Sequence, residues 1–202
     1  MTDRKQVETL GNWGVDLVGF IFHKGSPRYV MKDQIKSAGL ESTFPGLSKV
    51  GVFVNEPMDQ LLAIAEKWKL DYIQLHGDET PDYCQQLQQF LPVIKAFRIA
   101  PYDQILEKTK EFDSVSYFLF DTLGKQYGGT GEKFNWDQLL VPLQKPYFIS
   151  GGIGPDDFSA LSTLEKKSVQ LYGIDINSKF EEIPGYKNLD KISSFIEQLK
   201  TN

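Results

Sequence analysis

Seven short apolar runs, separated by stretches with helical periodicity, predict an α/β fold built on a parallel sheet. Each run is too short for a helix, and several are almost continuous in Val, Ile, Phe and Tyr, which is typical of strands covered on both faces. No Gly-x-Gly-x-x-Gly turn follows the first run, so a doubly wound dinucleotide-binding sheet is disfavoured. Seven or eight strand–helix units favour a (β/α)8 TIM barrel, and no linker divides residues 1–202 into more than a single barrel domain.

The predicted strands follow one another along most of the chain. They are LVGFIF (17–22), KVGVFV (49–54), YIQLHG (72–77), PVIKAFRI (92–99), YFLFDT (117–122), PYFISGG (146–152) and LYGIDIN (171–177). Helices are predicted at 2–13, 59–69, 81–90 and 189–200, where apolar residues recur with a period near 3.6. A further helix is expected to open at Pro155 and Asp156.

The beginning of the chain does not match a complete barrel. Residues 2–13 are predicted to be a helix with Asp3 near its start, although a barrel of this kind opens on a strand. Only seven strands are visible, so we expect an N-terminally incomplete barrel with strand 1 missing from this chain.

Composition restricts the function further. The formal charge is −5, which argues against nucleic acid as the main partner. The single cysteine, Cys84, excludes an internal disulfide, and with only two histidines the chain lacks the usual Cys/His set of a structural zinc site. The first ten residues are too charged for a signal peptide, and no apolar run approaches the ~20 residues of a membrane span. We therefore expect a cytoplasmic protein with neither nucleic-acid nor membrane partners.

Active sites of barrels lie where the strands end, and Asp121 ends the predicted strand at 117–122. An apolar surrounding favours the protonated form of a carboxyl group, so Asp121 is the best general-acid candidate. Capping of the following turn is an equally good interpretation of this aspartate.

His76 ends the third strand, where a histidine satisfied by neighbouring backbone is commoner than a catalytic one. Cys84 is expected to be a small buried hydrophobe.

Two further groups of residues indicate recognition of anions. Ser150, Gly151 and Gly152 follow the sixth strand, and glycines there let backbone N–H groups approach a phosphate near a helix N-terminus. A tight strand-to-helix turn is the plainer interpretation of the same residues. Arg28, beside a proline, suits bidentate recognition of a carboxylate or phosphate, although a solvated surface arginine is the commoner situation.

Eight segments of the chain form a recognisable series: GVDLVGFIFHKGSPRYV, KVGVFVNEP, IQLHGDETPDYC, PVIKAFRI, LFDT, YGGTGEKFNW, SGGIGPDDF and GIDINSKFEEIPGYKN, which run from about residue 14 to the C-terminus. Taken in order, they resemble the phosphoribosylanthranilate isomerase family of tryptophan biosynthesis. Each motif alone is weak, whereas SPRYV, QLHGDE, GGTGxxFxW and SGG in this order are highly specific.

The resemblance implies a (β/α)8 barrel and an Amadori rearrangement of N-(5′-phosphoribosyl)anthranilate to 1-(2-carboxyphenylamino)-1-deoxyribulose 5-phosphate, without cofactor or metal. It implies that Asp121 is the general acid and that Arg28 faces the anthranilate carboxylate. His76 and Asp175 would line the substrate pocket. The phosphate would be held by Ser150, Gly151, Gly152, Asn177 and Ser178.

The sequence departs from the family pattern in two places. Many members read DVSSGVE where this chain has DINSKFE, so Lys179 replaces a glycine and adds positive charge near the phosphate end. Members also begin with a strand ending in Lys-Ile/Val-Cys-Gly, whose cysteine is the general base, and no such motif precedes Thr2 here. We therefore expect that Met1 is an internal methionine of a longer protein and that this chain is impaired in catalysis.

Two alternatives stay open at this point. One is a non-catalytic barrel that binds a phosphorylated ligand or is completed by a strand from a partner. The other is a different amino-sugar isomerase on the same phosphate-binding scaffold. The substrate is a phosphorylated small molecule in most of these interpretations, and both a monomer and a homodimer are compatible with the sequence.

Overall fold

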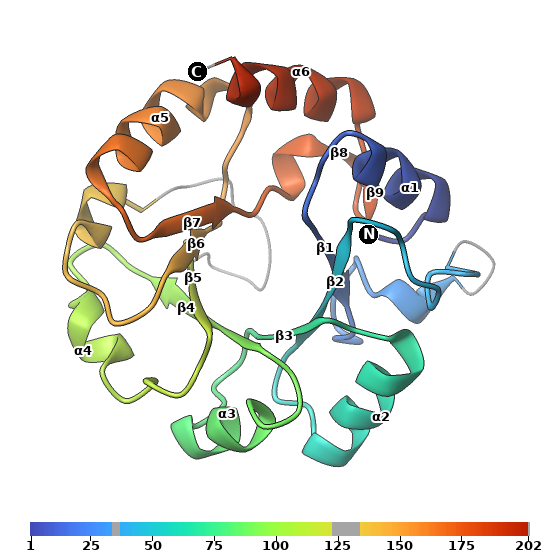
Figure 1. The fold of residues 1–202 in the computed structure, drawn as a ribbon, viewed down its shortest axis with the longest axis horizontal. Helices are drawn as coiled ribbons and strands as arrows, with labels where there is room; N and C mark the ends of the chain where they lie inside the picture. Colours follow the sequence, from blue (N-terminus) through green and yellow to red (C-terminus); the bar gives the residue numbers. More distant parts are fainter. Residues whose placement is uncertain (34–36, 123–133, 202) are drawn as a thin grey trace.

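A computed structural model describes residues 1–33, 37–122 and 134–201. Seven strands form one parallel sheet in which each strand pairs with the next along the chain. The sheet curls on itself, and Figure 1 looks into the curl. Its strands are β1 (Leu17–Ile21), β2 (Ser48–Phe53), β3 (Tyr72–Leu75), β4 (Val93–Ile99), β5 (Tyr117–Thr122), β6 (Tyr147–Ile149) and β7 (Leu171–Ile174).

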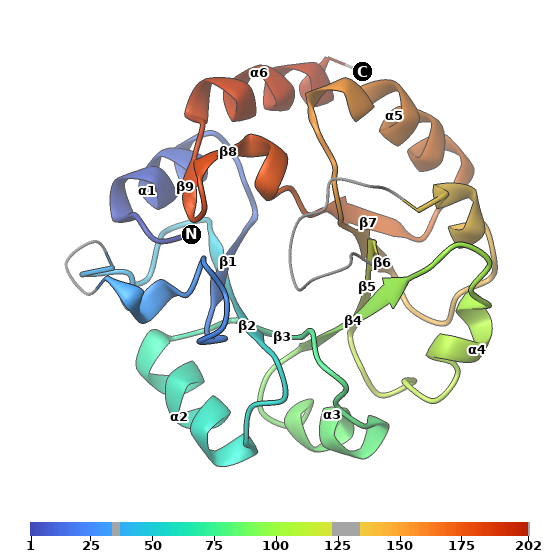
Figure 2. The same ribbon diagram turned by 180° about the vertical axis from the view of Figure 1, so that it is seen from behind.

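Helices surround the curled sheet on its outer side, as the two opposite views show (Figures 1 and 2). The α-helices are α1 (Arg4–Asn12), α2 (Met58–Trp68), α3 (Pro81–Leu87), α4 (Ile105–Thr109), α5 (Phe158–Lys167) and α6 (Leu189–Lys200). Short 3-10 helices are η1 (Val30–Lys32), η2 (Trp136–Leu139), η3 (Pro155–Asp157) and η4 (Ser178–Phe180). In the described part of the chain, no helix has both the length and the apolar character needed to cross a membrane.

All seven strands predicted from the sequence are confirmed, as are the helices at both ends and the two that follow β2 and β3. Local signals explain several helix starts: the Asp3 side chain accepts a hydrogen bond from the Gln6 backbone N–H, and Thr80 caps α3 in the same way. The helix expected to open at Pro155 begins as η3 and continues as α5. The helix predicted at 81–90 ends earlier, at Leu87.

Apart from the short 3-10 helices η1, η2 and η4, the sequence analysis missed two elements of the described chain. One is α4, a short helix of five residues. The other is an antiparallel hairpin of β8 (Glu181–Ile183) and β9 (Tyr186–Lys187), which lies between β7 and α6 in the chain. Its turn contains the dipeptide Pro184–Gly185, with Gly185 at φ 86°, and this turn signal was available in the sequence.

The core has two parts, because alternate residues of each strand face opposite sides of the sheet. The smaller cluster contains Val50, Ile94, Ala96, Leu119 and Phe148. A much larger cluster includes side chains of the helices, among them Leu61, Trp68, Leu161 and Phe195. Both faces of the sheet are therefore covered by apolar side chains, which is why the strands are nearly continuous in apolar residues.

The first and last strands of the sheet do not pair with each other within the described residues. The backbone of Met1 lies along the free edge of β1, where its terminal nitrogen donates a hydrogen bond of 2.7 Å to the Gly19 carbonyl. Met1 is 8% exposed and belongs to the larger core cluster. The expected α/β fold on a parallel sheet of seven strands is thus confirmed in the described residues, and the sheet they form is curled and open between β7 and β1.

Lys49 is a buried lysine on β2 that organises the loop before the strand. Its ammonium nitrogen donates to three consecutive backbone carbonyls, those of Leu40, Glu41 and Ser42, at 3.2, 3.1 and 2.9 Å. Its backbone N–H donates to the Asp71 carboxylate at 2.7 Å. One side chain thus ties the loop at residues 40–42 to the sheet.

Replacing Lys49 with methionine should lower the free energy of unfolding by about 2 kcal/mol, because a buried carbonyl left without a donor costs roughly 1–3 kcal/mol. Urea denaturation measures this loss. Lys67→Met, at an exposed position of α2, is the matched control and should change stability by less than about 0.5 kcal/mol. Equal effects of the two substitutions would show that the loop does not depend on Lys49.

Candidate active site

A cavity of about 330 Å³ lies where the strands of the curled sheet end. It is lined by every residue that the sequence analysis proposed for the site: Arg28, His76, Asp121, Ser150, Gly151, Gly152, Asp175, Asn177 and Ser178. These residues follow β1, β3, β6 and β7 or end β5, so the carboxyl ends of parallel strands bring them together. The apolar wall of the same cavity includes Val50, Ile94, Leu119 and Phe148.

Asp121 lies against His76, with 3.2 Å between a carboxylate oxygen and the Nε2 nitrogen of the ring. The other ring nitrogen, Nδ1, is 3.2 Å from the amide nitrogen of Gln74. An amide nitrogen can only donate, so this contact leaves Nδ1 as the acceptor and puts the proton of a neutral ring on Nε2, facing Asp121. The idea that neighbouring backbone satisfies the His76 ring is therefore wrong: both ring nitrogens have side-chain partners.

Gly151 allows the turn after β6 to approach Asp121 closely. Its φ is +88°, and a Cβ atom placed there would lie 2.5 Å from a carboxylate oxygen of Asp121 and 2.5 Å from the backbone nitrogen of Thr122. Any other residue would collide with the proposed acid. Glycine is thus required here both for its backbone conformation and for its lack of a side chain.

The turn after β6 also offers donors for an anion. Gly152, like Gly151, has a positive φ, and the backbone N–H groups of these two residues donate to no other described residue. Asn177 and Ser178 follow β7 and line the same cavity. Free backbone N–H groups next to hydroxyl and amide side chains are the donor set that a phosphate requires.

Arg28 is not a solvated surface arginine. Its side chain is 13% exposed and pairs with the Glu181 carboxylate, which is 5% exposed. The Arg28 Nε donates to the two carboxylate oxygens at 3.1 and 2.9 Å, and Nη2 donates to one of them at 2.7 Å. Although burial of Glu181 opposes ionisation, the bonds from Arg28 and the charge of Lys187 hold the pKa of this carboxyl below its usual value.

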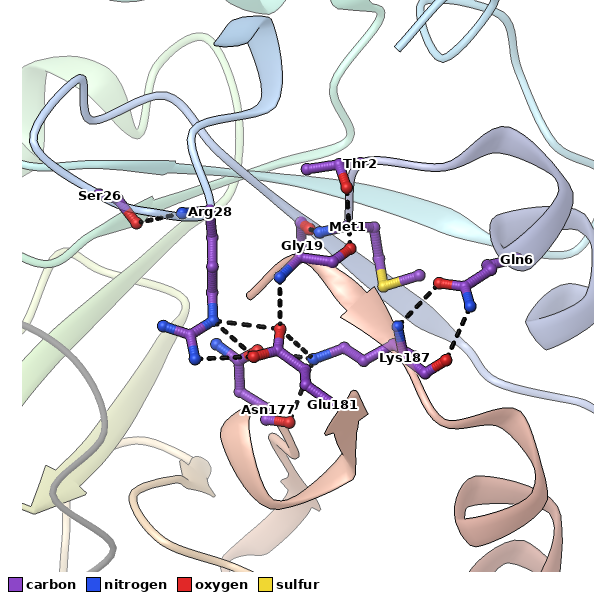
Figure 3. Close-up of polar contacts among 10 residues, drawn as sticks. Met1, Thr2, Gln6, Gly19, Ser26, Arg28, Asn177, Glu181 and Lys187 are labelled. Atoms are coloured by element: carbon purple, nitrogen blue, oxygen red, sulfur yellow. Dashed lines mark hydrogen bonds and ion pairs between the residues drawn. The ribbon is translucent and has the colours of Figure 1, made fainter. Parts of the chain in front are cut away.

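Lys187 lines the cavity, and the sequence analysis did not single it out. Its side chain is 8% exposed, lines the cavity and donates to the Glu181 carboxylate at 3.2 Å and to the Asn177 side chain at 2.6 Å. Gln6 of α1 holds the Lys187 backbone through two hydrogen bonds (Figure 3). Charged residues in EEIPGYKN read as an exposed segment, so no sequence signal marks Glu181 or Lys187 as buried.

Asp175 is a second carboxyl group of the cavity. The Ser150 hydroxyl donates to it at 3.1 Å. Burial raises the pKa of Asp175 above its ordinary value, and the nearby Asp121 carboxylate acts in the same direction, while Lys187 and the bond from Ser150 oppose the rise. The cavity therefore contains two carboxyl groups in different environments.

Several sequence predictions fall outside this cavity or outside the described residues. Cys84 is fully buried on α3, so the expectation of a small buried hydrophobe is confirmed. Burial also raises the pKa of its thiol to about 11. Lys179, on η4, is exposed and does not line the cavity. The glycine-rich segment at 127–131 lies outside the residues that the structure describes.

Comparison with known proteins identifies the family. The model of the N-(5′-phosphoribosyl)anthranilate (PRA) isomerase family matches residues 1–198. A relative from Parabacteroides distasonis, N-(5′-phosphoribosyl)anthranilate isomerase, is 38% identical over an alignment 202 residues long. The alignment covers 98% of this chain and 90% of the relative.

Solved structures agree with the sequence match. The crystal structure of phosphoribosyl anthranilate isomerase from Thermotoga maritima superposes with a TM-score of 0.86 at 29% identity, covering 100% of this chain and 96% of that one. Another crystal structure of the isomerase, in complex with reduced 1-(o-carboxyphenylamino)-1-deoxyribulose 5-phosphate, gives a TM-score of 0.82 at 26% identity, with 100% and 96% coverage.

The curled parallel sheet, with its polar cavity at the strand ends, places the chain among the α/β enzymes that act on small molecules at the carboxyl ends of their strands. Within this class, the chain belongs to the N-(5′-phosphoribosyl)anthranilate isomerase family. It is an isomerase of L-tryptophan biosynthesis, an intramolecular oxidoreductase of the aldose–ketose type.

The contact of Gly151 with Asp121 can be tested against a second glycine of similar conformation. Gly46 has a φ of +73°, and nothing lies within 4 Å of the place that a methyl group would take there, so Gly46→Ala should cost only the strain of the left-handed backbone, about 1 kcal/mol. Gly151→Ala carries the same strain and also displaces Asp121, so it should cost about 1–3 kcal/mol more. Urea denaturation compares the two variants, and equal losses would contradict the close approach.

Asp175 should make stability depend on pH in a defined direction. Its folded pKa is raised, so its contribution to stability is full below the unfolded pKa of about 3.9 and is lost as pH rises through the folded pKa. Asp175→Asn removes this loss. Relative to the parent protein, the variant should therefore gain stability as pH rises from about 4 through the raised pKa of Asp175, as urea denaturation at a series of pH values would measure.

The exposed Asp156→Asn controls for the change in net charge. A stability difference between Asp175→Asn and the parent that stays constant, or falls, as pH rises would contradict the raised pKa of Asp175.

Proposed function

We propose that the cavity is the site where N-(5′-phosphoribosyl)anthranilate is rearranged to 1-(2-carboxyphenylamino)-1-deoxyribulose 5-phosphate, with Asp121 as the general acid. The observation that carries the proposal is that one cavity contains a carboxyl group, a largely buried guanidinium and a glycine turn whose N–H groups donate to no described residue. A substrate with a reacting sugar, a carboxylate and a phosphate requires these three kinds of group.

Asp121 would protonate the ring oxygen of the sugar and so open the ring to a Schiff base. A general base would then remove the proton on C2, and the resulting enolamine would tautomerise to the ketone. After Asp121 has given up its proton, the Nε2 proton of His76 faces the new carboxylate at 3.2 Å and stabilises its charge. Gln74 supports this role because it fixes which ring nitrogen of His76 carries the proton.

Binding would be divided between the two ends of the substrate. Arg28 would pair with the anthranilate carboxylate, while the phosphate would lie on Ser150, Gly151, Gly152, Asn177 and Ser178. His76 and Asp175 would line the space between. The steps are proton transfers and need neither cofactor nor metal. The partner would be this phosphorylated small molecule and no nucleic acid, in keeping with the net charge of −5.

We further propose that the seven strands are part of a single-domain (β/α)8 barrel, whose remaining strand lies between β1 and β7. The hydrogen bond from Met1 to Gly19 supports this place, because it already extends the pairing along the free edge of β1. A strand there would satisfy the unpaired backbone groups of both edges. The family's cysteine base would stand at the end of that strand, close to Met1, which lines the cavity.

If a strand belongs between β1 and β7, adding it to the chain should change both stability and turnover. A segment of about eight residues ending in Lys-Val-Cys-Gly, fused before Met1, should raise the free energy of unfolding and increase turnover at least ~10²-fold over the same segment with alanine in place of cysteine. A steady-state assay of the rearrangement and urea denaturation measure the two effects. Equal turnover with cysteine and alanine, or full turnover by the 202-residue chain itself, would refute the assigned base.

The acid is tested in the same strand-bearing protein. Asp121→Asn should lower kcat by roughly 10²- to 10⁴-fold, the usual contribution of general acid catalysis, because an amide cannot protonate the ring oxygen. Asp113→Asn, at an exposed position, is the control and should leave kcat unchanged. Turnover of Asp121→Asn within about threefold of the parent would exclude Asp121 as the acid.

A further inference from the structure

We infer that Glu181 is a positioning residue that holds the Arg28 guanidinium in a fixed orientation and thereby sets the preference for a substrate with a carboxylate on its aromatic ring. The inference rests on the proposed function, in which Arg28 binds that carboxylate. It adds a residue with no assigned role, on the β8–β9 hairpin, to the specificity of the site.

The geometry of the pair indicates which donors remain for a ligand. A guanidinium presents one pair of donors on its Nε–Nη2 side and another at its Nη1–Nη2 end. Glu181 occupies the first side, because Nε and Nη2 of Arg28 both donate to its carboxylate. No described residue accepts a hydrogen bond from Nη1, so the end-on pair of donors is available to a second carboxylate.

Glu181 is itself held firmly. Its carboxylate accepts from the Gly185 backbone N–H at 3.0 Å. It also accepts from the Lys187 ammonium at 3.2 Å, in addition to Arg28 (Figure 3). The Lys187 backbone is fixed in turn by Gln6 of α1. Arg28 is therefore anchored through the hairpin to the first helix, and its long side chain loses the freedom that would weaken recognition of a planar carboxylate.

The end-on donors of Arg28 favour an additional anion. Two cations, Arg28 and Lys187, share the single carboxylate of Glu181 at this end of the cavity. Asp175 is a second acidic neighbour of Lys187, because the charge of Lys187 opposes the rise in the pKa of that carboxyl. Arg28 pairs with Glu181 alone among the described residues, and its Nη1–Nη2 end has no acidic partner there. An anionic group of the ligand would complete the pairing, because buried charges are stable only when paired.

Binding experiments can separate this role from an ordinary structural ion pair. The probes are reduced 1-(o-carboxyphenylamino)-1-deoxyribulose 5-phosphate and the same compound without its ring carboxylate. Isothermal titration calorimetry gives Kd for both probes with the 202-residue chain, with Glu181→Gln and with the matched control Glu182→Gln, whose side chain is exposed on the same strand.

The parent protein and Glu182→Gln should both prefer the carboxylated probe by at least about tenfold, the effect of one charge-assisted pair. Glu181→Gln should reduce this preference by about tenfold or more while leaving the Kd of the probe without the carboxylate within about twofold. In an Arg28→Ala background, where both probes should bind alike, Glu181→Gln should have no further effect on the preference. A merely structural role for Glu181 would instead weaken both probes equally.

Any other result of these binding experiments overturns either the proposed function or the inference about Glu181. If the parent protein binds neither probe, the proposed function fails and the inference fails with it. If the parent binds both probes without preference, Arg28 does not read the carboxylate, and the inference fails although phosphate binding stands. If the parent discriminates and Glu181→Gln discriminates equally well, the inference alone is wrong. Should Glu181→Gln not fold, Glu181→Asp, which withdraws the carboxylate by one methylene, should lower the preference in the same direction.

Discussion

Parallel pairing of consecutive strands is the constraint on which the rest of this structure depends. Because β1 to β7 all run in the same direction, their carboxyl ends meet at one rim, and residues as far apart in the chain as Arg28 and Ser178 face one cavity. The helices that return the chain between strands cover the outer face and bury the larger apolar cluster. The inner face is closed by the smaller cluster, which forms the apolar wall below the polar rim. The apolar clusters that stabilise the fold thus cover the two faces of the sheet, whereas the polar groups of the cavity lie at its rim.

Polar and charged side chains at this rim contact one another in small groups. His76 faces Asp121, Ser150 faces Asp175, and Glu181 lies between two cations. A buried Glu79–Lys95 pair, with 2.8 Å between its charged atoms, ties the loops after β2 and β3 to β4 beside the site. Each of these groups would be costly to bury alone, so the pairs fix the positions of the loops as well as their charges.

Sequence reasoning singled out residues that line the cavity but not their partners. Asp121, Arg28 and the Ser150–Gly152 turn stand at strand ends in the sequence, and the parallel fold then requires them to meet. Gln74, Glu181 and Lys187 carry no comparable signal: Gln74 reads as one polar residue inside a strand, and the other two read as charges of an exposed segment. Only the Pro184–Gly185 turn could have revealed the hairpin that buries them.

The sequence by itself determined the order and the type of the main elements, because apolar period and turn residues act over a few neighbouring positions. It also determined the family, through motifs in a fixed order. The tertiary structure decided which charges are buried, which nitrogen of His76 faces Asp121, and that Arg28 is anchored instead of solvated. These features depend on residues from distant segments, such as Arg28 and Glu181, whose approach is set by the curl of the sheet and by no local pattern of the chain.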